Sequence, residues 1–222
     1  VLLVLLLSVA SPRQSSPSGA VPRYERAPCP VEIAPGERVD CGILVVPERR
    51  GVAGTRAILL PVMIFRSRLA VPAADPVLFM AGGPGGSTVA GRRSGKNVPF
   101  LDDRDFILLE QRGAHHAQPA LRCPDVNRLK GDVAAGRLRG TAATEALSAA
   151  AAACRRQLTS SGVDLDGYTS AAAADDIEDL RKALGYETWN LHGLSYSTRL
   201  MLTVLRRHPA GVRSVILDSV LP

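Results

Sequence analysis

The chain has 222 residues, of which 46% are hydrophobic and only 4% aromatic, so its length allows one α/β domain or a large part of a bigger one. The formal net charge is +6, and arginines carry nearly all of the positive charge. These arginines are scattered and form no basic tract with interleaved aromatic residues. The composition therefore argues against nucleic-acid binding, and we interpret the charge as solvated surface charge.

The chain begins with an apolar leader. Residues 1–7 are uniformly apolar, Ser8, Val9 and Ala10 follow, and a stretch rich in Ser, Pro and Gly extends to Pro22. This is the pattern of a signal-peptide core with a cleavage site after Ala10, and it is too short to span a bilayer. We therefore expect residues 1–22 to be a leader and the protein to be secreted, with no stable membrane anchor.

Four cysteines fit an exported protein: Cys29, Cys41, Cys123 and Cys154. They allow three pairings, and proximity favours Cys29–Cys41 and Cys123–Cys154, each stabilising the fold by about 3 kcal/mol in the loop-entropy model. A zinc site is the alternative. However, the spacings are not of the C-x-x-C kind, and His115 and His116 are adjacent rather than one helical turn apart. We therefore predict two disulfides and no metal site.

Strand-like and helix-like segments alternate along the rest of the chain. Strands are predicted over residues 39–46, 57–65, 76–80, 105–109, 188–191 and 212–217. Helices are predicted over residues 141–158, 170–184 and 196–207. The later strands are almost wholly apolar, as strands buried on both faces are. The pattern predicts an α/β fold with a mostly parallel sheet and helices on both faces, within one domain over residues 23–222.

The segment Gly193-Leu194-Ser195-Tyr196-Ser197 joins a predicted strand to a predicted helix. A serine between small residues two positions away, at a strand-to-helix corner, is the pattern of a nucleophile elbow. The turn must be tight to raise the serine Oγ above the sheet, so the flanking small residues nearly touch the backbone. Gly193 meets that demand, and Ser197 adds one hydroxymethyl group. The pattern predicts Ser195 as the nucleophile of a serine hydrolase.

A glycine-rich loop, Ala81-Gly82-Gly83-Pro84-Gly85-Gly86-Ser87, follows the predicted strand 76–80. Acyl transfer needs preformed donors for an oxyanion, and glycines let backbone N–H groups approach it closely. We predict the N–H groups of Tyr196 and Gly83 as these donors, with Gly82 as the alternative to Gly83. The loop lacks the Gly-Lys-Ser/Thr end of a Walker loop and the spacing of a dinucleotide loop, so no cofactor is predicted.

Residues 76–87, 105–123 and 168–222 resemble the secreted tripeptidyl-aminopeptidase and prolyl-aminopeptidase-like branch of the α/β-hydrolase fold. The Gly-Gly-Pro-Gly loop, the Gln-Arg-Gly turn at 111–113 and the Ser-Tyr elbow are the most specific motifs. The resemblance extends from about Cys29 onward and corresponds to the N-terminal half of such an enzyme. It implies an exported serine peptidase that hydrolyses peptides from a free N-terminus, with small esters as side substrates.

Several positions depart from the pattern of this family. Ala81 stands where His often precedes the loop, Glu110 replaces Asp before Gln-Arg-Gly, and Ser197 replaces Gly. Ala114-His115-His116-Ala117 replaces a turn that contains Gly. None of these changes removes a catalytic atom, and together they indicate a divergent member.

The acid and the histidine of a catalytic triad follow the serine in this fold. After Ser195 the sequence holds one histidine, His208, and one aspartate, Asp218. We expect His208 to contact carbonyls at a helix end, Asp218 to be structural, and His192 to be buried beside the sheet. The sequence thus lacks the base that activates a serine. We interpret it as a truncated chain, incomplete at its C-terminus.

Two alternatives to the aminopeptidase stay open. One is an exported carboxylesterase of the same fold, because the parts that would distinguish peptide from ester substrates are not in this sequence. The other is a catalytically inactive, truncated homologue, in which Ser195 would not react.

Overall fold

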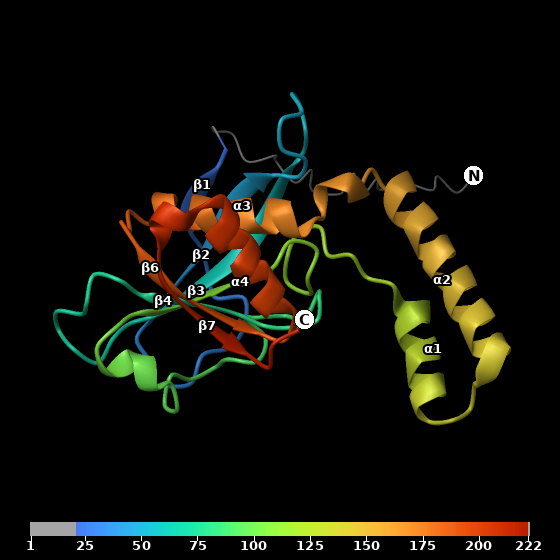
Figure 1. The fold of residues 1–222 in the computed structure, drawn as a ribbon, viewed down its shortest axis with the longest axis horizontal. Helices are drawn as coiled ribbons and strands as arrows, with labels where there is room; N and C mark the ends of the chain where they lie inside the picture. Colours follow the sequence, from blue (N-terminus) through green and yellow to red (C-terminus); the bar gives the residue numbers. More distant parts are fainter. Residues whose placement is uncertain (1–20, 222) are drawn as a thin grey trace, which may run out of the picture.

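A computed structural model describes residues 21–221 (Figure 1). The expected cleavage site after Ala10 lies outside the described residues. Seven strands form one sheet in the order β1-β2-β3-β5-β4-β6-β7. They are β1 (Arg23–Arg26), β2 (Val39–Pro47), β3 (Ala57–Phe65), β4 (Val77–Met80), β5 (Phe106–Leu109), β6 (Trp189–Leu194) and β7 (Val212–Asp218).

The sheet is mixed, with one dominant direction. The first three strands pair antiparallel with one another, and β3 pairs antiparallel with β5. Strands β5, β4, β6 and β7 pair in parallel. Because β2 and β5 are both antiparallel to β3, β2 points the same way as these four. The predicted mostly parallel sheet is confirmed, and the carboxyl ends of β4, β5 and β6 meet at one edge.

Apolar side chains fill both faces of the sheet. Helices α3 (Ser170–Ala183) and α4 (Tyr196–Arg207) pack on one face, over a core that includes Trp189 and Leu191. On the opposite face, the core of Phe106 and Leu108 is covered by Val89, Val98, Leu101 and other loop residues, with the 3₁₀ helix Pro99–Asp102. Among the described residues, the α-helical layer thus lies on one face only, and not on both faces as predicted.

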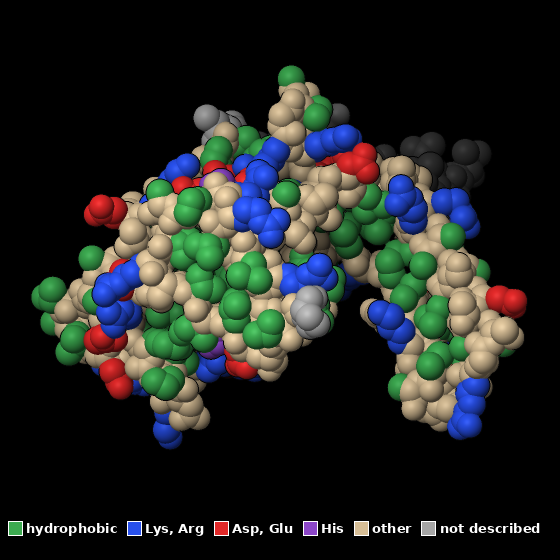
Figure 2. All heavy atoms as spheres, viewed as in Figure 1, with side chains coloured by type: hydrophobic (Ala, Val, Ile, Leu, Met, Phe, Trp, Pro, Cys, Tyr) green, Lys and Arg blue, Asp and Glu red, His purple; other side chains and the backbone are tan. Residues whose placement is uncertain are grey.

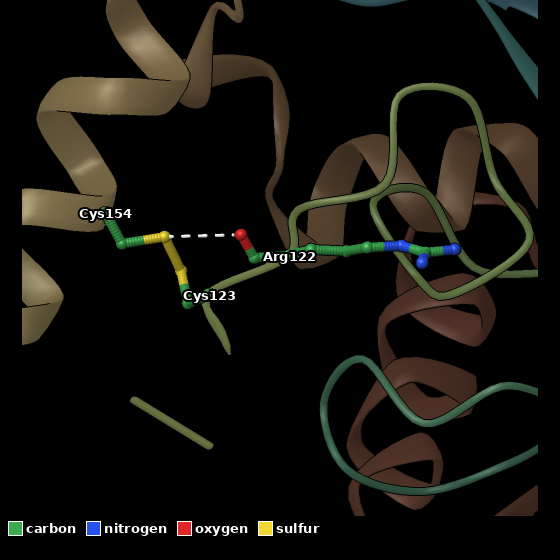
Figure 3. The surroundings of a disulfide bond; sticks show 3 residues. All are labelled: Arg122, Cys123 and Cys154. Atoms are coloured by element: carbon green, nitrogen blue, oxygen red, sulfur yellow. Dashed lines mark hydrogen bonds between the residues drawn. A yellow bond between two sulfur atoms is a disulfide. The ribbon is translucent and has the colours of Figure 1, made fainter. Parts of the chain in front are cut away.

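Helices α1 (Pro124–Ala134) and α2 (Gly140–Ser160) form a hairpin that projects from the sheet (Figure 1). No residue of α1 is buried, and in α2 only Ala143 and Cys154 are. A disulfide joins Cys123, directly before α1, to Cys154, whose Sγ lies 3.6 Å from the carbonyl oxygen of Arg122 (Figure 3). The disulfide ties α2 to the base of the hairpin.

The second disulfide joins Cys29 to Cys41 on β2. The structure thus has the pairing that proximity in the sequence favours. Of the helices described between residues 21 and 221, none combines the length and apolar character that crossing a membrane requires.

The predicted elements agree with the structure to within three residues at each end, and β3 and α4 have the predicted bounds. One strand and one α-helix, β1 and α1, were not predicted. Strand β1 has the polar sequence Arg-Tyr-Glu-Arg, which has no apolar alternation, and it forms by pairing along the edge of β2. Helix α1 contains Gly131 and buries nothing, but Val126, Leu129 and Val133 recur at helical spacing, so the sequence holds a signal for this helix that was not used.

Candidate active site

Ser195 lies at the corner between β6 and α4, with φ 54° and ψ −118°. A positive φ is uncommon for a residue with a side chain. The strained backbone is held on both sides, because the N–H of Ser195 donates to the carbonyl of Asp218 at 2.8 Å and its own carbonyl accepts from the N–H of Thr198 at 2.9 Å. Such a corner is the geometry that an elbow requires.

The corner leaves no room for a side chain at Gly193. A Cβ there would lie 2.4 Å from the carbonyl oxygen of Ser197 and 2.8 Å from Cγ of Met201. Ser197 itself is fully buried, and its hydroxyl donates to the carbonyl of Ala81 at 2.5 Å. The hydroxymethyl group that departs from the family pattern therefore links the elbow to the glycine-rich loop.

The glycine-rich loop packs directly on Ser195. A Cβ at Gly82 would lie 2.8 Å from Cβ of Ser195 and 3.4 Å from its Oγ. Gly83 has φ 132°, a conformation that favours glycine, and a Cβ there would meet the nitrogens of Gly85 and Gly86. The register of the sheet explains this proximity, because β4 pairs with β6 so that Met80 is opposite Gly193.

The Gln-Arg-Gly turn follows β5 at the same edge of the sheet. Oε1 of Gln111 accepts from the N–H of Gly85 at 3.4 Å, so this turn also supports the loop. Arg112 is buried and makes two hydrogen bonds, of 2.7 and 2.6 Å, to the carboxylate of Asp176 on α3. Its guanidinium also donates to the carbonyls of Glu48 and Gly167. The turn thus fixes the loop, β2 and α3 relative to one another.

A cavity of about 680 Å³ lies beside this corner, between the sheet edge and α1. Figure 2 shows the molecule hollowed between the hairpin and the sheet. On one side the cavity is lined by Gly85 and Gln111 from loops at the sheet edge, Tyr196 from α4 and Ser170 from α3. On the other side it is lined by Val126 and Lys130 from α1. The hydroxyls of Tyr196 and Ser170 lie 2.8 Å apart and share a hydrogen bond. Of the described residues that line the cavity, none is acidic.

The cavity is lined in part by residues for which no function was predicted. Gln111 lies in a motif that the sequence analysis noted without giving it a role. Ser170 and Lys130 come from segments far from the elbow in the chain, and no local pattern marks them. Their convergence follows from the fold alone.

His192 lies on the face of β6 opposite to Trp189 and Leu191. Its ring is between those of Phe79 and Phe100, at centroid distances of 5.1 and 5.8 Å. Its Nε2 is 3.9 Å from Oδ2 of Asp218, and its side chain is 17% exposed. Burial lowers the pKa of His192, and the nearby Asp218 carboxylate offsets this only in part. The imidazole is therefore neutral near pH 7, packed beside the sheet as expected.

The other histidines also lie away from Ser195. His208 follows α4, and its Nε2 is 2.8 Å from Oδ1 of Asp175, so it contacts a carboxylate of α3 rather than the helix-end carbonyls that we expected. The rings of His115 and His116 are 4.9 Å apart, in the turn after Gln-Arg-Gly. Within residues 21–221, no hydrogen bond joins a histidine to the Ser195 hydroxyl, and no three metal-binding side chains converge.

Asp218 contributes to the corner through its backbone. Its carbonyl accepts the N–H of Ser195, whereas its side chain is 54% exposed. Asp218 therefore has a structural role through its backbone, because the end of β7 holds the elbow in its strained conformation.

The chain is similar in sequence to known proteins. A family model described as alpha/beta hydrolase fold matches residues 75–222. A protein named probable proline iminopeptidase from Streptomyces coelicolor is 25% identical over 151 residues, covering 67% of this chain and 34% of its own length. Tripeptidyl aminopeptidase from Streptomyces lividans is 28% identical over 157 residues, covering 65% and 28%. The chain thus spans about a third of the length of these curated relatives.

Solved structures also match part of the chain. The proline iminopeptidase of Mycobacterium smegmatis superposes with a TM-score of 0.46 and 20% identity, over 78% of this chain and 42% of that one. A proline iminopeptidase-related protein from Thermus thermophilus gives a TM-score of 0.43 and 22% identity, over 82% and 44%.

Proposed function

The chain belongs to the alpha/beta hydrolase family, and from this premise we propose that it is a serine hydrolase in which Ser195 attacks an acyl carbon. The observation that carries the proposal is the contact between two motifs far apart in the sequence. The glycine-rich loop lies against a serine that the sheet holds at a positive φ. Acyl transfer requires preorganised donors near the carbonyl oxygen that a serine attacks, and the backbone N–H groups of such a loop are proposed to supply them.

In the proposed reaction, Ser195 Oγ bonds to the carbonyl carbon and passes its proton to a general base. The oxygen of the tetrahedral intermediate then accepts hydrogen bonds from the N–H groups of Tyr196 and Gly83. The bond to the leaving amine or alcohol breaks as the leaving group takes up the proton, and an acyl-serine remains. A water molecule attacks this ester by the same route and releases the acid.

The general base is proposed to lie outside the 222 residues. None of the four histidines, all of which lie among the described residues, is hydrogen-bonded to the Ser195 hydroxyl, and without a base this hydroxyl stays protonated at neutral pH. We therefore expect activity from the intact gene product and not from residues 1–222 alone.

We propose an exported aminopeptidase as the specific activity. The names of the two Streptomyces relatives support a peptidase, and the two disulfides support export, because disulfides persist in oxidising compartments. Peptides are the expected substrates, with no cofactor and no nucleic-acid partner. A carboxylesterase of the same fold is the second candidate, since the same serine and loop serve both reactions.

The test compares three substrates of the intact gene product: a tripeptidyl nitroanilide with a free amine, its N-acetylated form and a short-chain nitrophenyl ester. The aminopeptidase hydrolyses the first about 100-fold faster than the second, because it recognises the free amine in the transition state. An esterase prefers the third. Ser195→Ala is the control that removes all three activities. Wild-type protein that turns over none of them would mark an inactive homologue.

A further inference from the structure

Glu110 directly follows β5 and is fully buried. Its Oε2 accepts hydrogen bonds from the hydroxyl of Ser87 at 3.0 Å and from the N–H groups of Thr88 and Val89 at 2.8 and 3.2 Å. Its Oε1 accepts from the N–H of His116 at 3.0 Å. Within residues 21–221 no cation pairs with it, so this buried carboxylate is held by four neutral donors.

These donors belong to the two segments that flank the candidate site. Ser87 is the last residue of the glycine-rich loop, Thr88 and Val89 follow it directly, and His116 lies in the turn after Gln-Arg-Gly. At its beginning the same loop is held by the hydroxyl of Ser197 on the carbonyl of Ala81. Glu110 therefore anchors the far end of a loop whose near end is anchored by the elbow.

The loop needs such an anchor because of its composition. Glycines lose more conformational freedom on folding than other residues, and they offer no side chain that could pack. Donors for an oxyanion must nevertheless be fixed to a fraction of an ångström. A buried acceptor with a fixed position meets this need, because it orients consecutive backbone N–H groups at once.

We infer that Glu110 is a positioning residue that holds the glycine-rich loop in the geometry needed for oxyanion stabilisation. The inference rests on the proposed function of Ser195. It assigns to Glu110 an effect on the transition state, through the loop, in addition to the stability that any satisfied buried carboxylate gives. The two effects are separable by experiment.

The experiment measures kcat and KM of the intact gene product with its best substrate, and the affinity for a trifluoromethyl ketone analogue of that substrate. Glu110→Gln keeps the shape but turns an NH₂ group toward backbone N–H donors. We expect kcat and analogue affinity to fall together by about 30-fold, which is less than the roughly 100- to 1000-fold loss when an oxyanion donor is removed, because here the donor is only displaced. KM should change less than about twofold. Glu110→Asp keeps the charge one methylene shorter, and we expect it to recover part of the loss.

Glu178→Gln is the matched control, because Glu178 is also buried but pairs with Arg181 on α3. We expect this variant to lose stability and keep kcat. Ser87→Ala removes one donor to Glu110 and keeps the inference testable should Glu110→Gln not fold, with an expected loss in kcat of about threefold. Unchanged kcat in the folded variants, with wild-type activity present, overturns this inference alone. Absence of activity in the wild type overturns the proposed function, and this inference with it.

Discussion

The sheet corner around Ser195 and the hairpin of α1 and α2 are held together in opposite ways. At the corner, Ser197 is fully buried and Gly193 has no free space around it. In the hairpin, α1 buries nothing, its ion pairs are exposed, and one disulfide ties α2 to its base. Close packing fixes atoms for chemistry, whereas a thinly packed segment opens locally at low cost. The first three predictions below test this contrast, and the fourth tests a partly exposed ion pair between α3 and α4.

The largest expected effect follows from breaking the buried pair of Arg112 and Asp176, each with a side chain 2% exposed. Arg112→Met leaves a buried carboxylate with one of its partners lost and should reduce the free energy of unfolding by about 3–5 kcal/mol. Urea unfolding followed by the fluorescence of Trp189, the single and fully buried tryptophan, measures this. The hairpin control is Arg128→Met, because Arg128 on α1 is exposed and pairs with Asp125 and Asp132. This change should cost less than about 0.5 kcal/mol. Equal losses would contradict the contrast.

The next effect is removal of the Cys123–Cys154 disulfide by a double change to serine. The bond closes a sequence separation of 31 residues, for which the loop-entropy model gives about 3.5 kcal/mol. We expect the loss to be local, with faster amide hydrogen exchange over residues 124–160 and unchanged exchange in β4 and β6. Loss of protection in those strands would show that the hairpin is part of the cooperative core.

Gly193→Ala should displace the elbow, because its Cβ would lie 2.4 Å from the backbone oxygen of Ser197. We expect kcat/KM of the intact gene product to fall about 100-fold, as small misplacements of a catalytic atom do. Gly131→Ala on α1 is the matched control, since a Cβ there meets nothing within 4 Å. That change should leave activity intact and stabilise the helix by about 0.5–1 kcal/mol. An active Gly193→Ala enzyme would argue against a tight elbow.

The smallest effect concerns Asp175 between α3 and α4. Burial alone would raise its pKa, but hydrogen bonds from Arg207 and His208 outweigh burial, and the pKa is lowered. A lowered pKa stabilises the fold above the ordinary value near 4, and this stabilisation is lost as pH falls through the folded value. Asp175→Asn should therefore cost less than about 1 kcal/mol at pH 7, because Arg207 is 43% exposed, and almost nothing near pH 2. A difference that does not change with pH would refute the ion-pair explanation.

The sequence was informative where one local rule dominates. The apolar strands and the elbow follow from periodicity and from the steric demands of a tight turn, so β3 and α4 were predicted with their bounds. It was uninformative where tertiary contacts decide. Strand β1 exists because β2 offers it an edge, and the contacts of Glu110, Ser170 and Lys130 arise only when distant segments meet. The position of His208 beside Asp175 has the same origin.

The most direct test of the central claim is covalent labelling of the intact gene product with a fluorophosphonate, followed by peptide mapping by mass spectrometry. The account predicts one adduct, on Ser195, that is absent from Ser195→Ala and unaffected by the hairpin variant Gly131→Ala. An adduct on another serine, or none on folded wild-type protein, would contradict it.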